Sequence, residues 1–388
     1  MATPASSAGA GEAAILQAPR ADQPSGAPFR LGNRPALTGI RALAMATVLV
    51  YHANFGPMPG SWVALQIFFV LSGFLITTML ASEARRHGRI SLTRFYSRRA
   101  VRLLPPLLLA VTLVTIYASF VHVYESSQRV WGDSLAALFY YADYRSALGH
   151  APFLGFFAPT WSLSVEEQFY IVWAVLLAVA VSRGRRRMAY GMAAAGMVLS
   201  AVDRTWLSLA APHFTEAVAA RTYYAFDTRA DALFFGCLLG LMAADGYFQR
   251  LPLWVPRVLT AAAATAAVVL VWVLFKVPVW SLATMVWWQP ATTVASAVLI
   301  MYFVLCPHSL GTRFVGLGVF VFLGELSYTV YLLHFGVYLA LEPGQRGTHW
   351  SFWPTELLRL AVILGLATAS WFAIERPLAR WRARSAAR

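Results

Sequence analysis

The sequence has little charge for its length. Only 12% of its 388 residues are Asp, Glu, Lys or Arg, whereas 59% are hydrophobic, and the mean hydropathy is +0.59. Soluble globular domains carry about 25% charged residues, so this composition excludes that class. The apolar stretches, mostly about 17 to 25 residues long, are long enough to cross a bilayer as helices, and they lack the alternation of a barrel strand. We therefore predict an all-α polytopic membrane protein.

Cysteine and lysine are also scarce. The two cysteines, Cys237 and Cys306, fall in or at apolar stretches and match no metal-ligand spacing, so we expect buried free thiols and no metal site. Residues 1–34 are rich in Ala, Gly, Ser and Pro and lack the apolar core of a signal peptide. We expect them to form a disordered cytoplasmic tail. No internal repeat is visible, and no soluble catalytic domain fits in the remaining segments.

The apolar pattern predicts about ten transmembrane helices. They cover residues 36–53, 62–80, 101–122, 160–182, 188–206, 225–244, 256–275, 285–305, 316–341 and 357–375. Most arginines then fall on the side of the N-terminus, whereas the opposite loops hold only Arg129, Arg145, Arg221, Lys276 and Arg346. The positive-inside rule therefore predicts that both termini are cytoplasmic. Short basic loops beside an anionic leaflet account for the net charge of +14, so no nucleic-acid partner is expected.

The first predicted helix, ALTGIRALAMATVLVYH, carries Arg41 near one end and His52 at the other. At ~100° and ~1.5 Å per residue, His52 returns to within about 20° of the face of Arg41, roughly 16 Å further along. Ionisable groups are costly in hydrocarbon, so residues kept there are functional candidates. The alternative is a snorkelling arginine at one interface and a histidine at headgroup level at the other.

The predicted orientation brings further ionisable groups to the outer layer of the membrane. They lie in the segments TWSLSVEEQFY, FDTRADALFFG and SYTVYLLH, and they are Glu166, Glu167, Asp227, Arg229, Asp231 and His334. Together with His52, this convergence from four helices predicts one shared functional site. Two simpler explanations exist. The helix dipole favours glutamates at a helix N-terminus, and Arg229 with Asp231 could form an internal ion pair.

The inner side carries a basic cluster in RFYSRRAVRLLPP. Arg99 and Arg102 are three residues apart, so on a helix they project from one face and can present two guanidinium groups to a phosphate. Arg94 and Arg98 extend this patch, although inside-positive topology alone could explain such arginines. Prolines 105 and 106 follow, and we expect them to break the helical hydrogen-bond ladder and shape a cavity.

Ser72 and Gly73 lie near the middle of the second predicted helix, WVALQIFFVLSGFLITTML. Small residues at this position let another helix, or a slender ligand, approach the backbone closely. Helix packing is the commoner reason for such a pair.

Taken together, these segments resemble the acyltransferase 3 family of bacterial integral-membrane O-acyltransferases. The matching stretches are LTGIRALAMATVLVYH, QIFFVLSGFLIT, RFYSRRAVRLLPP, TWSLSVEEQFY, DTRADALFFGCLLG, LGELSYTVYLLHF and a closing IERP. The resemblance implies an acyltransferase 3 transmembrane domain over 35–378 and a basic cytoplasmic tail over 379–388. The sequence departs from the family pattern at Thr38, where many members have Asp. Because the chain ends about a dozen residues after the last predicted helix, we expect no fused C-terminal hydrolase-like domain.

The family resemblance implies an enzyme in the bacterial cytoplasmic membrane. Such an enzyme transfers an acyl group, commonly acetyl from acetyl-CoA, to a hydroxyl of a sugar, a cell-surface glycan or a glycosylated metabolite. Acyl-CoA is then a substrate and not a permanently bound cofactor. The family's functional pattern maps onto Arg41 and His52, its paired arginines onto Arg99 and Arg102 beside Arg98, and its glutamate onto Glu166. The expected supporting or acceptor-side residues are Glu167, Ser72, Gly73, Arg229, Asp231, Tyr328 and His334. The identity of the acceptor is left open.

The expected mechanism places the coenzyme A phosphates on the cytoplasmic side with Arg99, Arg102 and Arg41. His52, with an ordinary pKa near 6.5, would remove the proton from the acceptor hydroxyl, and Glu166 would hold the imidazole tautomer. Alternatively, His52 takes the acyl group covalently before passing it on. A proton-coupled transporter or exporter of a polar metabolite or glycan precursor would also place Arg, Glu and His inside a helix bundle. The lack of a visible inverted repeat counts against that alternative.

Overall fold

The computed structural model describes residues 32, 34–53, 58–121, 127–148, 155–252, 254–342 and 351–386. Within these ranges every regular element is a helix, which confirms the all-helical prediction. The predicted cytoplasmic tail over 1–34 lies outside the described residues except for Gly32 and Arg34.

All ten predicted spans are helical. They correspond to α1 (Pro35–His52), α2 (Val63–His87), α3 (Leu92–Val121), α6 (Thr160–Ser182), α7 (Arg186–Ala210), α9 (Phe226–Ala244), α10 (Val255–Lys276), η4 with α11 (Thr284–Trp288 and Gln289–Leu305), α13 (Gly318–Ala340), and α14 with η5 (Phe352–Ser370 and Trp371–Glu375). The shorter elements are α4 (Ser127–Leu138), α5 (Ala142–Ala147), η2 (Gly155–Phe157), α8 (Glu216–Tyr224), η3 (Tyr247–Arg250), α12 (Leu310–Val315) and α15 (Arg376–Ala386). Helix α15 therefore runs through most of the predicted basic tail over 379–388.

Seven helices in the described part of the chain are long and apolar enough to cross a membrane. They are α2, α3, α6, α10, α11 with η4, α13, and α14 with its continuation. Helices α1, α7 and α9 do not meet this criterion, and each of them carries an arginine in its interior: Arg41, Arg204 and Arg229. In each of these three helices an arginine lies where contact with lipid would be costly.

Helix α3 begins at Leu92, nine residues before the predicted start at residue 101, and it continues through Pro105 and Pro106. The prolines remove their N–H groups from the hydrogen-bond ladder, as expected, but they do not end the helix, because neighbouring helices in a bundle can compensate for the lost hydrogen bonds. The hydropathy pattern placed the start at the first apolar run and missed the charged first turns. As a result Arg99 and Arg102 lie two to three turns inside a helix, and they reach into the bundle.

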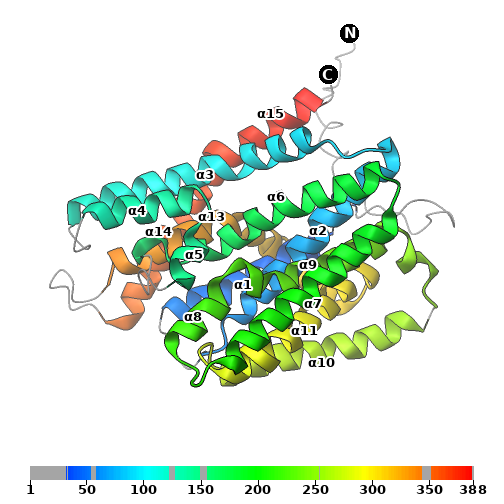
Figure 1. Ribbon diagram of the computed structural model, residues 1–388. Coiled ribbons are helices and arrows are strands. Elements are labelled where there is room, and N and C mark those ends of the chain that lie inside the picture. The colour runs from blue at the N-terminus through cyan, green and yellow to red at the C-terminus, as the bar shows by residue number, and fades with distance from the viewer. Residues whose placement is uncertain are drawn as a thin grey trace, which may run out of the picture.

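Helices α2 and α9 make the most extensive contact in the bundle, and glycines bring their backbones together. A Cβ atom on Gly73 would lie 2.0 Å from the carbonyl oxygen of Leu233, and one on Gly236 would lie 2.2 Å from that of Val70. Real side chains cannot occupy these positions without moving a backbone, so packing explains Gly73. This interface fixes α2, which runs through the middle of the bundle (Figure 1).

The remaining long helices lie roughly side by side around this pair, with α10 at one edge and α3 with α15 at the opposite edge (Figure 1). Helix α1 packs mainly on α13, and α2 also contacts α1, α6 and α11. Four helices from distant parts of the sequence, α1, α2, α6 and α13, thereby gather in the centre of the molecule.

The short helix α5 lies outside the predicted spans, packs on α6 and α8, and buries Asp143 completely. Gln168 Nε2 donates a hydrogen bond to Asp143 at 2.9 Å. Burial nevertheless raises the pKa of Asp143 from 3.8 to about 7. A carboxyl with a raised pKa in the folded state stabilises the fold most below its unfolded pKa, and this contribution is lost as the pH rises toward the folded value.

We therefore expect the thermal stability of the protein to fall between about pH 4 and about pH 7, in part because Asp143 loses its proton inside the fold. Asp143→Asn removes the titrating group and keeps the shape of the side chain, so the fall should be smaller in this variant. Thermal unfolding followed across this pH range measures the difference. Identical pH dependence in the two proteins would contradict the prediction.

Candidate active site

A cavity of about 330 Å³ opens between α1, α2, α3, α6 and α13, and we call it the arginine cavity. Its polar lining consists of Arg41, Ser72, Arg98, Arg99, Arg102, Ser162, Glu166, Glu167, Tyr170, Ser327, Tyr328 and Tyr331. Four guanidinium groups thus face two carboxylates, so the lining carries a net positive charge. An excess of fixed positive charge in a concave site attracts an anionic ligand.

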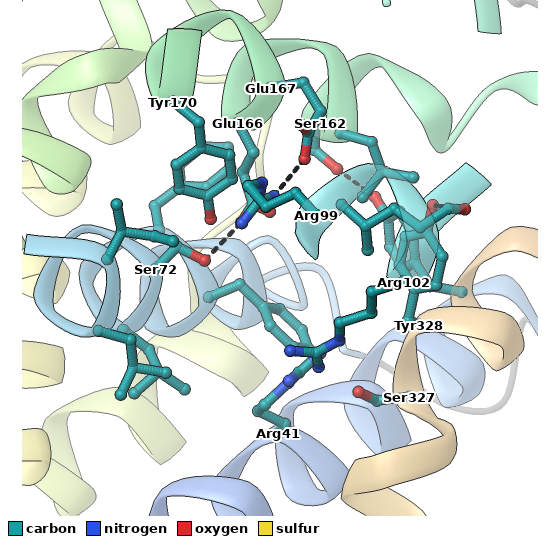
Figure 2. Close-up of a pocket in the computed structure, with 18 of the residues that line it drawn as sticks. Arg41, Ser72, Arg99, Arg102, Ser162, Glu166, Glu167, Tyr170, Ser327 and Tyr328 are labelled. Atoms are coloured by element: carbon teal, nitrogen blue, oxygen red, sulfur yellow. Dashed lines mark hydrogen bonds and ion pairs between the residues drawn. The ribbon is translucent and has the colours of Figure 1, made fainter. Parts of the chain in front are cut away.

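Arg99 is held firmly in this cavity. It forms an ion pair with Glu167, and its guanidinium carbon lies 3.7 Å from the ring centre of Tyr170 (Figure 2). Beside this pair, Ser72 Oγ donates a hydrogen bond to Glu166 Oε1 at 3.0 Å. Since Arg99 already has a counter-charge and a stacked ring, its first role is to fix the wall between α3 and α6.

Arg41 has no such partner. Among the described residues none makes a hydrogen bond or an ion pair with its guanidinium group, and its charge is opposed by that of Arg102 and balanced by that of Glu166. Figure 2 shows the side chains of Arg41 and Arg102 extending toward each other from different helices. Two like charges that face one another in a cavity are destabilising unless an anion binds between them. The space between Arg41 and Arg102 is therefore a candidate anion-binding position.

A second cavity, of about 230 Å³, contains His52, and we call it the aromatic cavity. It is lined by Val48, Tyr51, His52, Pro59, Ser61, Trp62, Leu65, Ala158, Pro159, Trp161, Tyr223, Tyr224, Val279, Trp280, Tyr331 and Phe335. His52 Nδ1 lies 2.9 Å from the carbonyl oxygen of Val48. Because a carbonyl can only accept, Nδ1 carries the proton and Nε2 keeps its lone pair, which is the tautomer that a general base requires.

His334 lies directly beside His52, with 5.0 Å between the ring centres. Its Nδ1 donates to the carbonyl oxygen of Tyr331 at 2.7 Å, and the side chain is fully buried. Its Nε2 has no hydrogen-bond partner within the described ranges. The structure thus pairs the two histidines that the sequence placed in one layer, and both are held by backbone carbonyls.

The two cavities are stacked along the same four helices. From one end to the other, α1 contributes Arg41 and then His52, and α13 contributes Tyr328 and then Phe335. Helices α2 and α6 run the opposite way and contribute to both cavities in the reverse order. Two residues, Leu65 and Tyr331, line both cavities and form the partition between them. The hydroxyl of Tyr331 donates to the carbonyl oxygen of Pro159 at 2.9 Å and lies 2.6 Å from Ser162 Oγ, so this ring is fixed in place.

The predicted site residues are thus divided between two places. The arginine cavity brings together Arg41, Ser72, Arg98, Arg99, Arg102, Glu166, Glu167 and Tyr328, whereas the aromatic cavity holds His52. The structure does not bring Glu166 to His52. The expected single outer layer divides because α3 carries its arginines deep into the bundle, where they attract both glutamates. The carbonyl of Val48, and not Glu166, holds the imidazole tautomer.

Arg229 and Asp231 line neither cavity, and they do not pair with each other. Asp231 forms a buried ion pair of 2.8 Å with Arg204 of α7, which is not among the predicted site residues. Arg229 donates to Gln289 and lies over the rings of Tyr223 and Trp161, at 5.0 and 5.9 Å from their centres. Arg229 therefore stands behind the aromatic cavity and supports its wall.

Sequence reasoning also missed Tyr170, Tyr331 and Trp280. A signal existed for Tyr331, which precedes His334 by three residues on the same helix and so shares its face. Trp280 lies in the short connection between α10 and η4, and no periodicity could place it at a site formed by other helices.

Across the residues that the structure describes, no group of three or more His, Cys, Asp or Glu side chains could hold a metal ion. Cys237 is buried, Cys306 is partly buried, and both are free.

Comparison with known proteins relates this architecture to a family. A family model described as "Acyltransferase domain" matches residues 34–376. The chain is 30% identical over 354 residues to "Peptidoglycan O-acetyltransferase OatA" of Listeria monocytogenes, which covers 89% of this chain and 55% of that protein. It is equally similar to "Putative peptidoglycan O-acetyltransferase YrhL" of Bacillus subtilis, at 30% identity over 354 residues, covering 89% of this chain and 54% of that protein.

A shorter match, 29% identical over 213 residues, relates the chain to "O-acetyltransferase OatA" of Staphylococcus aureus and covers 54% of this chain and 34% of that protein. The chain thus spans about half the length, or less, of the curated relatives that it matches. No solved structure matches it significantly.

Proposed function

Because the chain belongs to the acyltransferase domain family, we propose that it is a multi-pass O-acetyltransferase of the bacterial cytoplasmic membrane. In this proposal it moves an acetyl group from acetyl-CoA to a hydroxyl of a cell-surface glycan. The relatives named as peptidoglycan O-acetyltransferases support a glycan as the acceptor class. Ten spans with both termini in the cytoplasm complete the proposed topology, in which the arginine cavity opens toward the cytoplasm.

The observation that carries the proposal is the stacking of the two cavities on α1, α2, α6 and α13. A cationic cavity suits the phosphates of coenzyme A, which cannot cross hydrocarbon, and an imidazole with a free Nε2 lies in the adjoining cavity. Arg41 and His52, eleven residues apart on one helix, are separated by roughly 16 Å along its axis. A slender acyl arm that starts between Arg41 and Arg102 can span this distance past Leu65 and Tyr331.

The chemistry follows from this placement. His52 Nε2 accepts the proton of the acceptor hydroxyl while the hydroxyl oxygen attacks the thioester carbonyl, which forms the new C–O bond. The C–S bond then breaks, and the departing sulfur takes the proton back from His52, so that an ester and free coenzyme A result. His52 is neutral again at the end of the cycle. Glu166, hydrogen-bonded to Ser72, supplies the counter-charge that keeps Arg41 in the cavity when no donor is bound.

The donor site makes a prediction about Arg41 and Arg102. A hydrogen bond to a charged group contributes about 1.5–3 kcal/mol, so Arg41→Ala or Arg102→Ala should weaken acetyl-CoA binding about 10- to 150-fold. The matched control is Arg94→Ala. Arg94 lies on α3 like Arg102, but its side chain is exposed and does not line the cavity. Binding of labelled acetyl-CoA to the purified proteins measures the effect. Unchanged affinity in both cavity variants would refute the donor site.

The transporter alternative is tested in detergent, where no membrane separates two compartments and transport cannot be observed. Purified protein in detergent, supplied with labelled acetyl-CoA and a mixed bacterial glycan, should produce labelled glycan and free coenzyme A. A carrier would leave both substrates unchanged. Protein that is folded and binds acetyl-CoA but never labels an acceptor would overturn the proposed function.

A further inference from the structure

Four aromatic rings form a continuous cluster on one side of the aromatic cavity. Trp161 lies 5.1 and 5.0 Å from the rings of Tyr223 and Tyr224, and Trp280 lies 5.5 and 5.8 Å from the same two rings. All four residues line the cavity that contains His52. They come from α6, α8 and the connection before η4, so three separate elements contribute to one ring-lined wall.

The aromatic cavity also differs from its neighbour in charge. No Asp, Glu, Lys or Arg is among the described residues that line it, and His52 supplies its only imidazole. The arginine cavity, by contrast, is lined by four arginines and two glutamates. A carboxylate or phosphate that entered the aromatic cavity would lose its hydration and find no cation to replace it, which is costly. A neutral molecule with an apolar face meets no such penalty.

On the basis of the proposed function, we propose that the aromatic cavity is the acceptor site and that it selects a neutral pyranose ring. The C–H groups on one face of a pyranose are weakly positive and pack well on the negative face of an aromatic ring. The hydroxyls at the edge of the same sugar can then point toward His52. Trp280 is the specificity-determining residue of this site, because it stands at the exposed end of the cluster with 46% of its surface accessible.

The wall is built in advance of binding. Arg229 is completely buried, has no carboxylate partner among the described residues, and lies behind Tyr223 and Trp161. Its Nη1 donates to Gln289, whereas its Nε and Nη2 atoms make no hydrogen bond within the described ranges and lie among aromatic rings. A buried cation held this way fixes both rings from the side away from the cavity. A rigid wall lowers the entropy that binding must overcome.

The test compares two acceptors of equal length that differ in charge. One is a neutral N-acetylglucosamine tetrasaccharide, and the other is a tetrasaccharide in which glucuronate alternates with N-acetylglucosamine. Calorimetric binding to the full-length protein in detergent, without acetyl-CoA, should detect the neutral compound and find the charged one at least about tenfold weaker. Trp280→Ala should weaken binding of the neutral compound about tenfold, and Trp280→Phe should restore part of it.

The matched control is Trp287→Ala, because Trp287 lies seven residues away, is 71% exposed and does not line the cavity. This control should bind like the wild type. Equal binding of both tetrasaccharides, or wild-type affinity in Trp280→Ala, would overturn the neutral-sugar site. Acetyl transfer to the same compounds is measured separately. Binding that depends on Trp280 without any transfer would contradict the proposed function alone, whereas transfer that is independent of Trp280 would contradict the acceptor site alone.

Discussion

Replacing His52 with alanine is expected to abolish acetyl transfer and to leave the protein folded and inserted. A positioned general base contributes about 10²- to 10⁴-fold to a rate, and within the described part of the aromatic cavity His52 is the only imidazole in the lining. The loss should appear in the turnover rate. Acetyl-CoA affinity should be unchanged, since the arginine cavity lies about 16 Å away along α1. Steady-state kinetics with labelled acetyl-CoA, together with a donor-binding measurement, test both parts.

Product formation at the wild-type rate in His52→Ala would refute the assignment. The same protein also separates direct transfer from a covalent acyl-histidine. With labelled acetyl-CoA and no acceptor, direct transfer predicts no label on the wild-type protein after rapid quenching, whereas a covalent route predicts label that disappears in His52→Ala.

A comparably large loss is expected from Leu65→Trp. Leu65 is buried and lines both cavities, so a bulkier ring at this position should block the proposed path of the acyl arm between Arg41 and His52. Displacing reacting groups by about 1 Å already costs about 10²-fold in rate, and a blocked passage should cost at least as much. Donor binding should survive, because the substitution leaves the arginines of the proposed donor site in place.

Leu65→Met is the matched control, since it conserves volume and should retain most of the activity. Transfer and acetyl-CoA binding are measured on both variants. A Leu65→Trp protein that transfers acetyl groups at the wild-type rate would show that the acyl group does not pass between the two cavities. A variant that loses donor binding as well would show that the donor does not bind between Arg41 and Arg102 alone.

The helices of this protein could be predicted from sequence because apolar runs are a strong and local signal. The ends of the helices could be predicted less accurately. Helix α3 begins nine residues before its apolar run, and those residues determine the site, since they carry Arg99 into the bundle. A hydropathy pattern marks where lipid begins, not where a helix begins.

The residues of the site could be predicted from their types and positions in the sequence, but the partners of these residues could not. Thr38 offers Arg41 no local counter-charge, and a favourable charge comes from Glu166, which lies on a helix more than a hundred residues away. Likewise Asp231 pairs with Arg204 and not with Arg229 two residues before it. Residues two apart on a helix point in different directions, so their partners come from other helices, whose packing a single sequence does not reveal.

In the proposed mechanism, donor and acceptor enter from opposite sides of the membrane and react through two adjoining cavities. Vesicles that contain the purified protein and enclose labelled acetyl-CoA, with a neutral glycan only outside, test it most directly. Labelled glycan should form outside, no acetyl-CoA should appear outside, and His52→Ala should form no product. Product that forms only when donor and acceptor share one compartment would contradict it.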